Sequence, residues 1–184
     1  MKTCLVGCGG IAAVHGSVLT SGIDTEFVAA ADIKPEKAQT YAENFHTKPY
    51  PSLESMLEAE KPDVLHICTP HYLHVPMAIY SLERNINVFM EKPPAISFDQ
   101  LEELKKAAAK SEAQLGFCYQ NRYNASIRAA KDLIDSGKAG KVHGARAFVT
   151  WCRGAAYYTE SGWRGSLKTE VLQLWRVQRL FFNS

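Results

Sequence analysis

The chain lacks the features that mark several classes of protein. Its five cysteines show no C-x-x-C spacing, so a disulfide framework and a zinc site are both disfavoured, and we expect reduced thiols. Lys and Arg number 21 against 19 Asp and Glu, and no basic block precedes the C-terminal stretch, which argues against a nucleic-acid partner. No apolar run approaches the roughly 18 residues of a membrane span, and a strand is expected directly after Lys2, where a signal peptide would need its own apolar region. We therefore expect a cytoplasmic protein without a membrane partner.

What the chain does have is a regular alternation of strand and helix patterns. With 46% hydrophobic residues in 184, it can form one full domain, or one domain and part of another. Short apolar runs predict strands at residues 4–6, 26–31, 63–68, 87–90 and 114–119, and helical spacing predicts helices at 11–20, 35–45, 52–61, 75–84, 97–110 and 125–136. This order predicts the α/β class, with a doubly wound parallel Rossmann sheet.

The pattern changes after Gly144. Residues 145–151 read as a further strand, and aromatic residues follow in a loop punctuated by glycine. We therefore predict a nucleotide-binding domain over residues 1–120 and the beginning of an α+β substrate domain over 121–184, with a divergent tail from about residue 171.

Residues 4–12 (CLVGCGGIA) predict a strand, a glycine turn and the start of a helix. Gly7 allows the tight turn, Gly9 lets the backbone approach a pyrophosphate, and Ala12 lets the helix pack closely on the strand. The helix beginning near Ile11 would direct its free N–H groups at the phosphates. A G-x-G-x-x-A pattern by itself also fits an ordinary glycine-rich turn.

Asp32 supports the dinucleotide interpretation. It ends the second strand, 25 residues after Gly7, close to the spacing of about 20 in the dinucleotide fingerprint. A carboxylate there accepts hydrogen bonds from ribose hydroxyls and repels a 2′-phosphate, so NAD is favoured over NADP, although Lys34 partly offsets the repulsion. The alternative is that Asp32 caps a helix that begins at Pro35.

Three predicted strands end in polar segments, at residues 69–74, 91–94 and 119–123. In open α/β sheets the ligand lies beyond the carboxyl ends of the strands, so these segments should converge on the cofactor. A partly desolvated Lys92 beside Glu91 can exchange a proton with a hydroxyl or carbonyl group. The alternative is a solvated charge pair with no role in catalysis.

The glycine turn with His15, Cys68-Thr69-Pro70 with His74, Glu91-Lys92-Pro93 and Arg122-Tyr123, in this order, resemble the Gfo/Idh/MocA family of NAD(P)-dependent oxidoreductases. The resemblance covers about residues 1–165. It implies hydride transfer between a nicotinamide cofactor, NAD or alternatively NADP, and a hydroxyl of a sugar, polyol or related compound. The implied catalytic residue is Lys92. The implied cofactor residues are Gly7, Gly9, Gly10, Ile11, Asp32, Thr69, Pro70, His74, Glu91 and Lys92, and the implied substrate residues are Arg122, Tyr157, Trp163 and Arg164.

The end of the chain departs from this family. Members continue with a glycine run and a helix carrying histidine and aspartate, whereas no glycine follows Gly165 here. We hypothesise a shifted reading frame or an alternative exon near Glu170, which the coding DNA would test. The alternative function is therefore a truncated, catalytically deficient dinucleotide-binding protein. A further alternative takes residues 171–184 as a basic amphipathic helix that binds a membrane or a partner.

Two smaller expectations complete the sequence analysis. His71 and His74 have H-x-x-H spacing, but without a third ligand nearby they make a poor zinc site, so no metal is expected. The apolar and aromatic residues that a longer chain would cover predict association into a homo-oligomer. These residues are Phe148, Val149, Trp151, Tyr157 and Tyr158.

Overall fold

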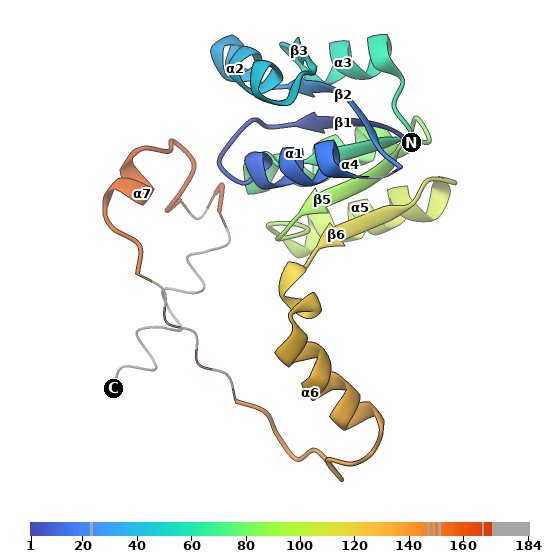
Figure 1. Cartoon of the computed structure of the whole chain (residues 1–184), viewed down its shortest axis with the longest axis vertical. Coiled ribbons are helices and arrows are strands. Elements are labelled where there is room, and N and C mark those ends of the chain that lie inside the picture. Colours follow the sequence, from blue (N-terminus) through green and yellow to red (C-terminus); the bar gives the residue numbers. More distant parts are fainter. Residues whose placement is uncertain (23, 147, 149, 151, 167, 171–184) are drawn as a thin grey trace. The chain divides into compact units, whose positions relative to one another are not determined.

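The computed structural model describes all residues except 23, 147, 149, 151, 167 and 171–184 (Figure 1). The chain forms two compact units. The first contains Met1–Cys118 together with Trp163–Ser184, and the second contains Tyr119–Gly162. The predicted tail interpretations, a divergent segment or an amphipathic helix, concern residues outside the described part of the chain.

The first unit is built on a six-stranded sheet in the order β3-β2-β1-β4-β5-β6, with every pair of neighbours parallel. Its strands are β1 (Lys2–Val6), β2 (Glu26–Ala31), β3 (Lys48–Tyr50), β4 (Val64–Ile67), β5 (Asn87–Glu91) and β6 (Leu115–Cys118). This is the strand order of a dinucleotide-binding fold, and it confirms the predicted doubly wound sheet.

Helices connect consecutive strands of the first unit. They are α1 (Ala12–Ser21), α2 (Pro35–Phe45), α3 (Leu53–Glu60), the 3₁₀ turn η1 (His71–Leu73), α4 (His74–Leu82) and α5 (Phe98–Lys110). Serine side chains begin two of them: the Oγ of Ser52 accepts from the N–H of Ser55, and that of Ser97 accepts from Gln100. Each bond satisfies one of the backbone donors that a helix start leaves free.

Alternate residues of the strands point to opposite faces of the sheet, and each face has its own helices. Cys4 and Val6 of β1 pack in one core cluster with α3, α4 and α5. Leu5, between them, packs in a second cluster with Ala12 of α1 and Tyr41 of α2. The strands are therefore covered on both sides, which explains their nearly continuous apolar sequences.

The second unit contains the 3₁₀ turn η2 (Gln120–Tyr123), α6 (Ala125–Asp135) and α7 (Ala156–Thr159). Gly137, with φ of 73°, follows the end of α6, as predicted. The predicted strand at 145–151 is not formed by its described members, residues 145, 146, 148 and 150. An isolated strand has no neighbour to complete its hydrogen bonds, so the apolar pattern is insufficient here.

Two further expectations fail in the first unit. β3 was not predicted, because three residues that include Pro49 carry little strand signal, and proline is tolerated there only because β3 is an edge strand. Phe98, expected on the inner face of α5, is 87% exposed, whereas Leu104 of the same helix is buried. Phe98 is the first residue of the helix, where side chains extend beyond the end of the packed face.

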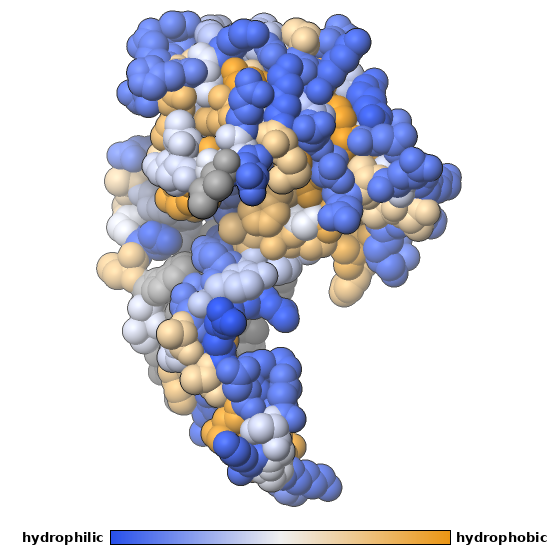
Figure 2. Space-filling model, turned by 45° about the vertical axis from the view of Figure 1, so that its right-hand side comes forward, coloured by the Kyte–Doolittle hydropathy of each residue, from blue (hydrophilic) through white to orange (hydrophobic). Residues whose placement is uncertain are grey.

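The surface is mainly hydrophilic, with apolar patches scattered over it in Figure 2. Exposed apolar side chains include Val14 and Val18 of α1 and Ile127 and Leu133 of α6. Across the described residues, no helix combines the length and apolar character needed to cross a bilayer.

Candidate functional site

The turn between β1 and α1 requires glycine at position 7. Gly7 has φ of 92°, in the region that side chains rarely adopt, and its N–H donates to the carbonyl of Ala31 at 2.8 Å. A Cβ at this position would lie 2.8 Å from backbone atoms of Cys68 and Thr69. The turn is therefore pressed against the end of β4, and no other residue fits.

Gly9 and Gly10 occupy open space. A Cβ added to either would meet no atom within 4 Å, and both residues are exposed at the start of α1. Nothing within the protein itself demands glycine here. A ligand that approaches the backbone would account for both glycines, and the nearby N-terminus of α1 offers free N–H groups suited to phosphate.

Asp32 lies beside this turn at the end of β2. Its Oδ2 accepts from the backbone N–H of Cys8 at 2.9 Å, and its Oδ1 accepts from the N–H of Lys34 at 2.9 Å. The first bond joins the carboxylate to the glycine turn. The second bond belongs to the local turn before α2. The N-cap residue of α2 is Lys34 and not Asp32. The carboxylate is therefore held next to the turn.

The loop after β4 contains buried polar atoms without a partner. Thr69 Oγ1 and His71 Nδ1 are buried and have no hydrogen bond. Burial lowers the pKa of His71 to about 4, so the ring is neutral at physiological pH. Unpaired buried polar atoms are uncommon in native proteins and call for an explanation such as a bound ligand or water.

His74 joins the β4 and β5 loops from the start of α4. It is completely buried, with Nδ1 2.8 Å from the carbonyl oxygen of Pro93 and Nε2 2.9 Å from that of Thr69. Burial lowers its pKa, although both carbonyls favour the protonated ring. A neutral ring donates to only one of them at a time. Both nitrogens face carbonyls, so His74 supports the loops that line the predicted nicotinamide region.

Glu91 and Lys92 end β5 and differ in exposure. Glu91 is 5% exposed, whereas the Lys92 side chain extends into solvent. The peptide between Lys92 and Pro93 is cis. The pair is therefore a buried carboxylate followed by an accessible ammonium at the carboxyl edge of the sheet. The expected partial desolvation of Lys92 is not seen in this structure, where Lys92 is exposed.

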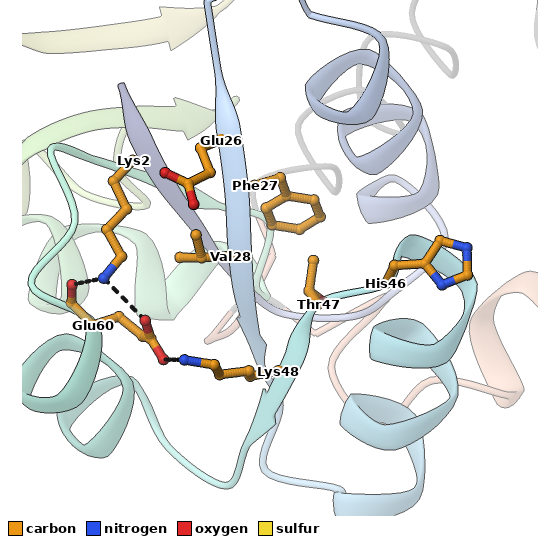
Figure 3. A pocket seen from close by; sticks show the side chains of 8 residues that line it. All are labelled: Lys2, Glu26, Phe27, Val28, His46, Thr47, Lys48 and Glu60. Carbon is orange, nitrogen blue, oxygen red and sulfur yellow. Dashed lines mark hydrogen bonds and ion pairs between the residues drawn. The ribbon is translucent and has the colours of Figure 1, made fainter.

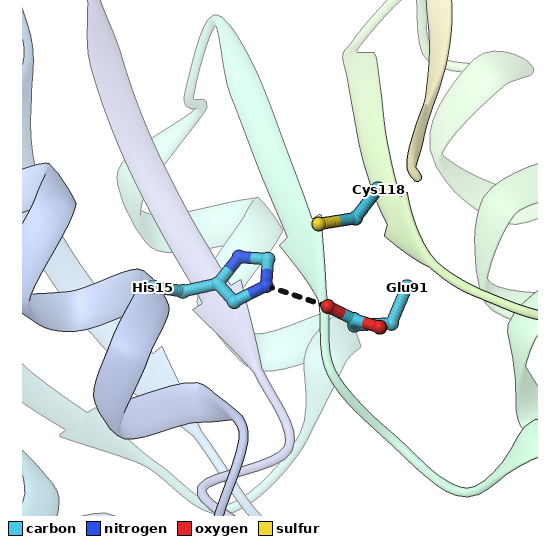
Figure 4. A group of neighbouring side chains, drawn as sticks. All are labelled: His15, Glu91 and Cys118. Atoms are coloured by element: carbon cyan, nitrogen blue, oxygen red, sulfur yellow. Dashed lines mark hydrogen bonds and ion pairs between the residues drawn. The ribbon is translucent and has the colours of Figure 1, made fainter. Parts of the chain in front are cut away.

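The structure adds three residues to which sequence reasoning assigned no function. His15 of α1 faces His66 of β4 and Glu91, and Cys118 of β6 lies beside them. The ligand-type atoms of His15, Glu91 and Cys118 lie within 4.8 Å of one another (Figure 4). A sequence signal did exist for one of them, because His66 interrupts an apolar strand.

The predicted substrate residues fall into two groups. Trp163 and Arg164 belong to the first unit, where the Trp163 ring meets His71 edge-on, with centroids 4.7 Å apart. The Glu170 carboxylate, which is buried, accepts from the N–H of Gly165 and so closes this segment. Arg122 and Tyr157 belong to the second unit.

A pocket of about 410 Å³ lies at the opposite, amino edge of the sheet and contains none of the predicted site residues (Figure 3). Its polar centre is Glu60, which is contacted by Lys2 Nζ at 3.0 Å and Lys48 Nζ at 2.9 Å. The Tyr50 hydroxyl donates to the same carboxylate at 2.6 Å. With Glu60 fully paired, this pocket has the character of a structural ion cluster.

The residues of the carboxyl edge together fit a dinucleotide. The turn at Gly7 and the start of α1 provide N–H donors for a pyrophosphate, and Asp32 provides acceptors for ribose hydroxyls. The loops after β4 and β5 provide the unpaired Thr69 hydroxyl and the accessible Lys92. Such a site can hold a nicotinamide cofactor and move a proton beside it.

Comparison with known proteins agrees with this geometry. Residues 1–119 match the model of the Gfo/Idh/MocA oxidoreductase family, described as an NAD-binding Rossmann fold. The chain is 28% identical over 165 residues to D-glucoside 3-dehydrogenase of Escherichia coli, covering 89% of this chain and 46% of that protein. It is also 28% identical to inositol 2-dehydrogenase/D-chiro-inositol 3-dehydrogenase of Lacticaseibacillus casei, covering 76% and 42% of the two chains.

Solved structures show the same relationship. The WlbA dehydrogenase of Chromobacterium violaceum, in complex with NADH and UDP-GlcNAcA, superposes with a TM-score of 0.88 at 31% identity, covering 92% of this chain and 49% of that one. The chain spans about half the length of the curated relatives it matches. The stretch that matches the family model, residues 1–119, includes the glycine turn, Asp32 and Lys92. The chain belongs to the Gfo/Idh/MocA family of oxidoreductases and contains that family's NAD-binding Rossmann domain.

Proposed function

We propose that this chain binds NAD at the carboxyl edge of its sheet and serves an oxidoreductase that acts on a hydroxyl of a sugar or polyol. When bound, the nicotinamide ring supplies hydride chemistry. Lys92 hydrogen-bonds the reacting oxygen and exchanges its proton, acting as general acid or base. Hydride transfer is thus assigned to the cofactor and proton transfer to the protein.

The observation that carries the proposal is the convergence of three separate strands on one edge. The turn after β1 holds Gly7, the end of β2 holds Asp32, and the end of β5 holds Lys92. The N–H of Cys8 bonds Asp32 directly to the glycine turn. A solvated charge pair, the alternative for Glu91-Lys92, does not explain why Glu91 is buried while Lys92 stays accessible.

The preference for NAD over NADP follows from Asp32. Each of its oxygens already accepts one backbone N–H, which leaves further lone pairs for two ribose hydroxyls. A 2′-phosphate at this point would place like charges in contact. We therefore propose NAD as the preferred cofactor, with weaker binding of NADP.

The substrate class is proposed from the relatives, which include glucoside and inositol dehydrogenases and one structure in complex with a UDP-sugar. We assign substrate contacts to Arg122, Tyr157, Trp163 and Arg164, and keep the division into domains at residues 1–120 and 121–184. Cytoplasmic location, a homo-oligomeric state and the absence of nucleic-acid, membrane and metal partners complete the proposal.

Titration of the purified chain with NAD and with NADP tests the cofactor site. We expect micromolar NAD affinity, weakened at least tenfold in Asp32→Ala and unchanged in Asp24→Ala, an exposed control. Gly9→Ala should also abolish binding while leaving the unfolding midpoint unchanged, because its Cβ meets no described protein atom and would lie where the pyrophosphate is proposed. If wild type binds neither cofactor, the proposal is wrong.

Turnover on a panel of sugars and polyols tests the catalytic assignment. Lys92→Ala should lose turnover at least a hundredfold with a much smaller loss of NAD affinity, whereas Lys106→Ala, another exposed lysine, should match wild type. NAD binding without turnover on any substrate would instead support the catalytically deficient dinucleotide-binding protein.

A further inference from the structure

The Glu91 carboxylate is held by donors from three elements. His15 Nε2, from α1, lies 3.1 Å from Oε1, and the backbone N–H of Lys92 donates to Oε2 at 3.2 Å. The Cys118 thiol, from β6, donates to the same carboxylate. Figure 4 shows the His15 ring and the Cys118 sulfur directed at Glu91 from two sides.

His66 completes a chain of hydrogen bonds on the far side of His15. The Nδ1 atoms of the two rings lie 2.9 Å apart, and the rings meet edge-on. Burial, with a contribution from His15, lowers the pKa of His66 to about 4, so this ring is neutral. With Glu91 ionised, the bond between His15 and Glu91 forms only when His15 Nε2 carries hydrogen, whichever ring supplies the proton between the Nδ1 atoms. His15 is therefore a donor to Glu91.

These bonds decide the charge of Glu91. Burial opposes ionisation, but the hydrogen bonds from His15 and Cys118 outweigh it and hold the pKa of Glu91 below its usual value. The neighbouring titratable groups belong to every element around it. They are His15 on α1, His66 on β4, Cys68 directly after β4, His71 on η1, His74 at the start of α4, Cys118 on β6 and Lys92 itself.

We propose that His15 is a positioning residue for the proposed oxidoreductase site: through its bond to Glu91 it fixes the turn that carries Lys92. The inference rests on the proposed function in one respect, which is the assignment of Lys92 to catalysis. The described contacts of His15 include Glu91 but not the Lys92 side chain. It acts through the Glu91 side chain, whose second oxygen accepts from the Lys92 backbone.

The test compares His15→Ala with His15→Gln, which keeps a donor near the position of Nε2. Infrared spectra of protein with ¹³C-labelled glutamate, referenced to Glu91→Gln, follow protonation of Glu91 against pH. In His15→Ala, Glu91 should take up its proton at least one pH unit higher than in wild type, and the dissociation constant for NAD should rise about tenfold. His15→Gln should restore most of both quantities. His143, an exposed histidine, provides matched Ala and Gln controls.

A second variant covers the case in which His15→Ala fails to fold. His66→Phe removes the partner of His15 Nδ1 without altering His15, and it should shift the Glu91 titration in the same direction by a smaller amount. Three results would overturn the proposal: an unchanged Glu91 titration, no rescue by His15→Gln, or stoichiometric zinc in the wild-type protein that is lost in the variants. If no form binds NAD, the proposed function fails, but the infrared titration still decides the role of His15.

Discussion

Each edge of the parallel sheet pairs one buried carboxylate, Glu60 at the amino edge and Glu91 at the carboxyl edge, but the β4 loop of the carboxyl edge also leaves two polar atoms unpaired among the described residues. At the amino edge, the carboxylate of Glu60 is contacted by Lys2, Lys48 and Tyr50. At the carboxyl edge, Thr69 Oγ1 and His71 Nδ1 are buried without partners. Thr47 Oγ1 at the amino edge is also unpaired, but the charged Glu60 there is fully matched.

The paired cluster around Glu60 serves stability, whereas the unpaired atoms of the β4 loop are available to a ligand. A cluster that satisfies itself contributes to folding and has little left to offer a ligand. Unpaired atoms destabilise the free chain and become favourable when a ligand supplies the missing hydrogen bonds. The pocket around Glu60 at the amino edge is thus a poorer candidate for chemistry than the loops of the carboxyl edge.

The largest expected effect is the loss of stability on substitution of Gly7, which the fold of the carboxyl edge requires. Gly7→Ala places a Cβ 2.8 Å from backbone atoms of Cys68 and Thr69 and forces φ of 92° on alanine. We expect a loss of about 4 kcal/mol in the free energy of unfolding, measured by chemical denaturation. Gly10→Ala, whose Cβ meets nothing, should stay within about 1 kcal/mol of wild type. Equal midpoints for the two variants would contradict the described turn.

The next effect is the pH dependence of the carboxyl edge. Burial lowers the pKa of His66 from 6.5 to about 4, so the unfolded chain binds a proton that the native chain excludes. Stability is therefore complete above pH 6.5 and decreases as the pH falls towards 4, by about 3 kcal/mol for this residue. His66→Phe should make the denaturation free energy less steep over this interval. An unchanged slope would show that His66 is protonated in the native protein.

The amino edge should respond at lower pH. Hydrogen bonds from Tyr50 and Lys48 outweigh burial and lower the pKa of Glu60 from 4.5 to about 2. Its contribution is present above pH 4.5 and is lost as the pH falls towards 2. Glu60→Gln should therefore destabilise the protein at pH 7 by about 2 kcal/mol after allowance for solvent screening, and the difference should vanish near pH 2. A difference independent of pH would mean that Glu60 acts by packing alone.

The smallest effect concerns the outer member of the same cluster. The Lys48 side chain is 68% exposed although its Nζ lies 2.9 Å from Glu60, so its ion pair is screened by water. Lys48→Ala should change the free energy of unfolding by only about 0.5 kcal/mol, less still in high salt. A change above about 2 kcal/mol would mean that the pair behaves as a buried one.

Much of the fold was predictable because its signals are local. The serines that begin α3 and α5, and the strand runs that became β1, β4 and β5, depend on residues adjacent in the chain. β3 was missed because an edge strand of three residues is specified by its neighbour β2 and not by its own sequence. Among its described residues, the strand expected at 145–151 does not form, because its own apolar pattern is insufficient without a neighbouring strand.

The site divides along the same line. The glycine turn, Asp32 and Lys92 could be placed at one edge from the sequence, because parallel strands bring their carboxyl ends together. Local chemistry by itself determined that turn, the strand and helix order and the resulting sheet. Only the tertiary structure decided that His15, His66, Glu91 and Cys118 meet. These residues lie on a helix and three strands far apart in the chain, and it is strand pairing and the packing of α1 that bring their side chains into contact.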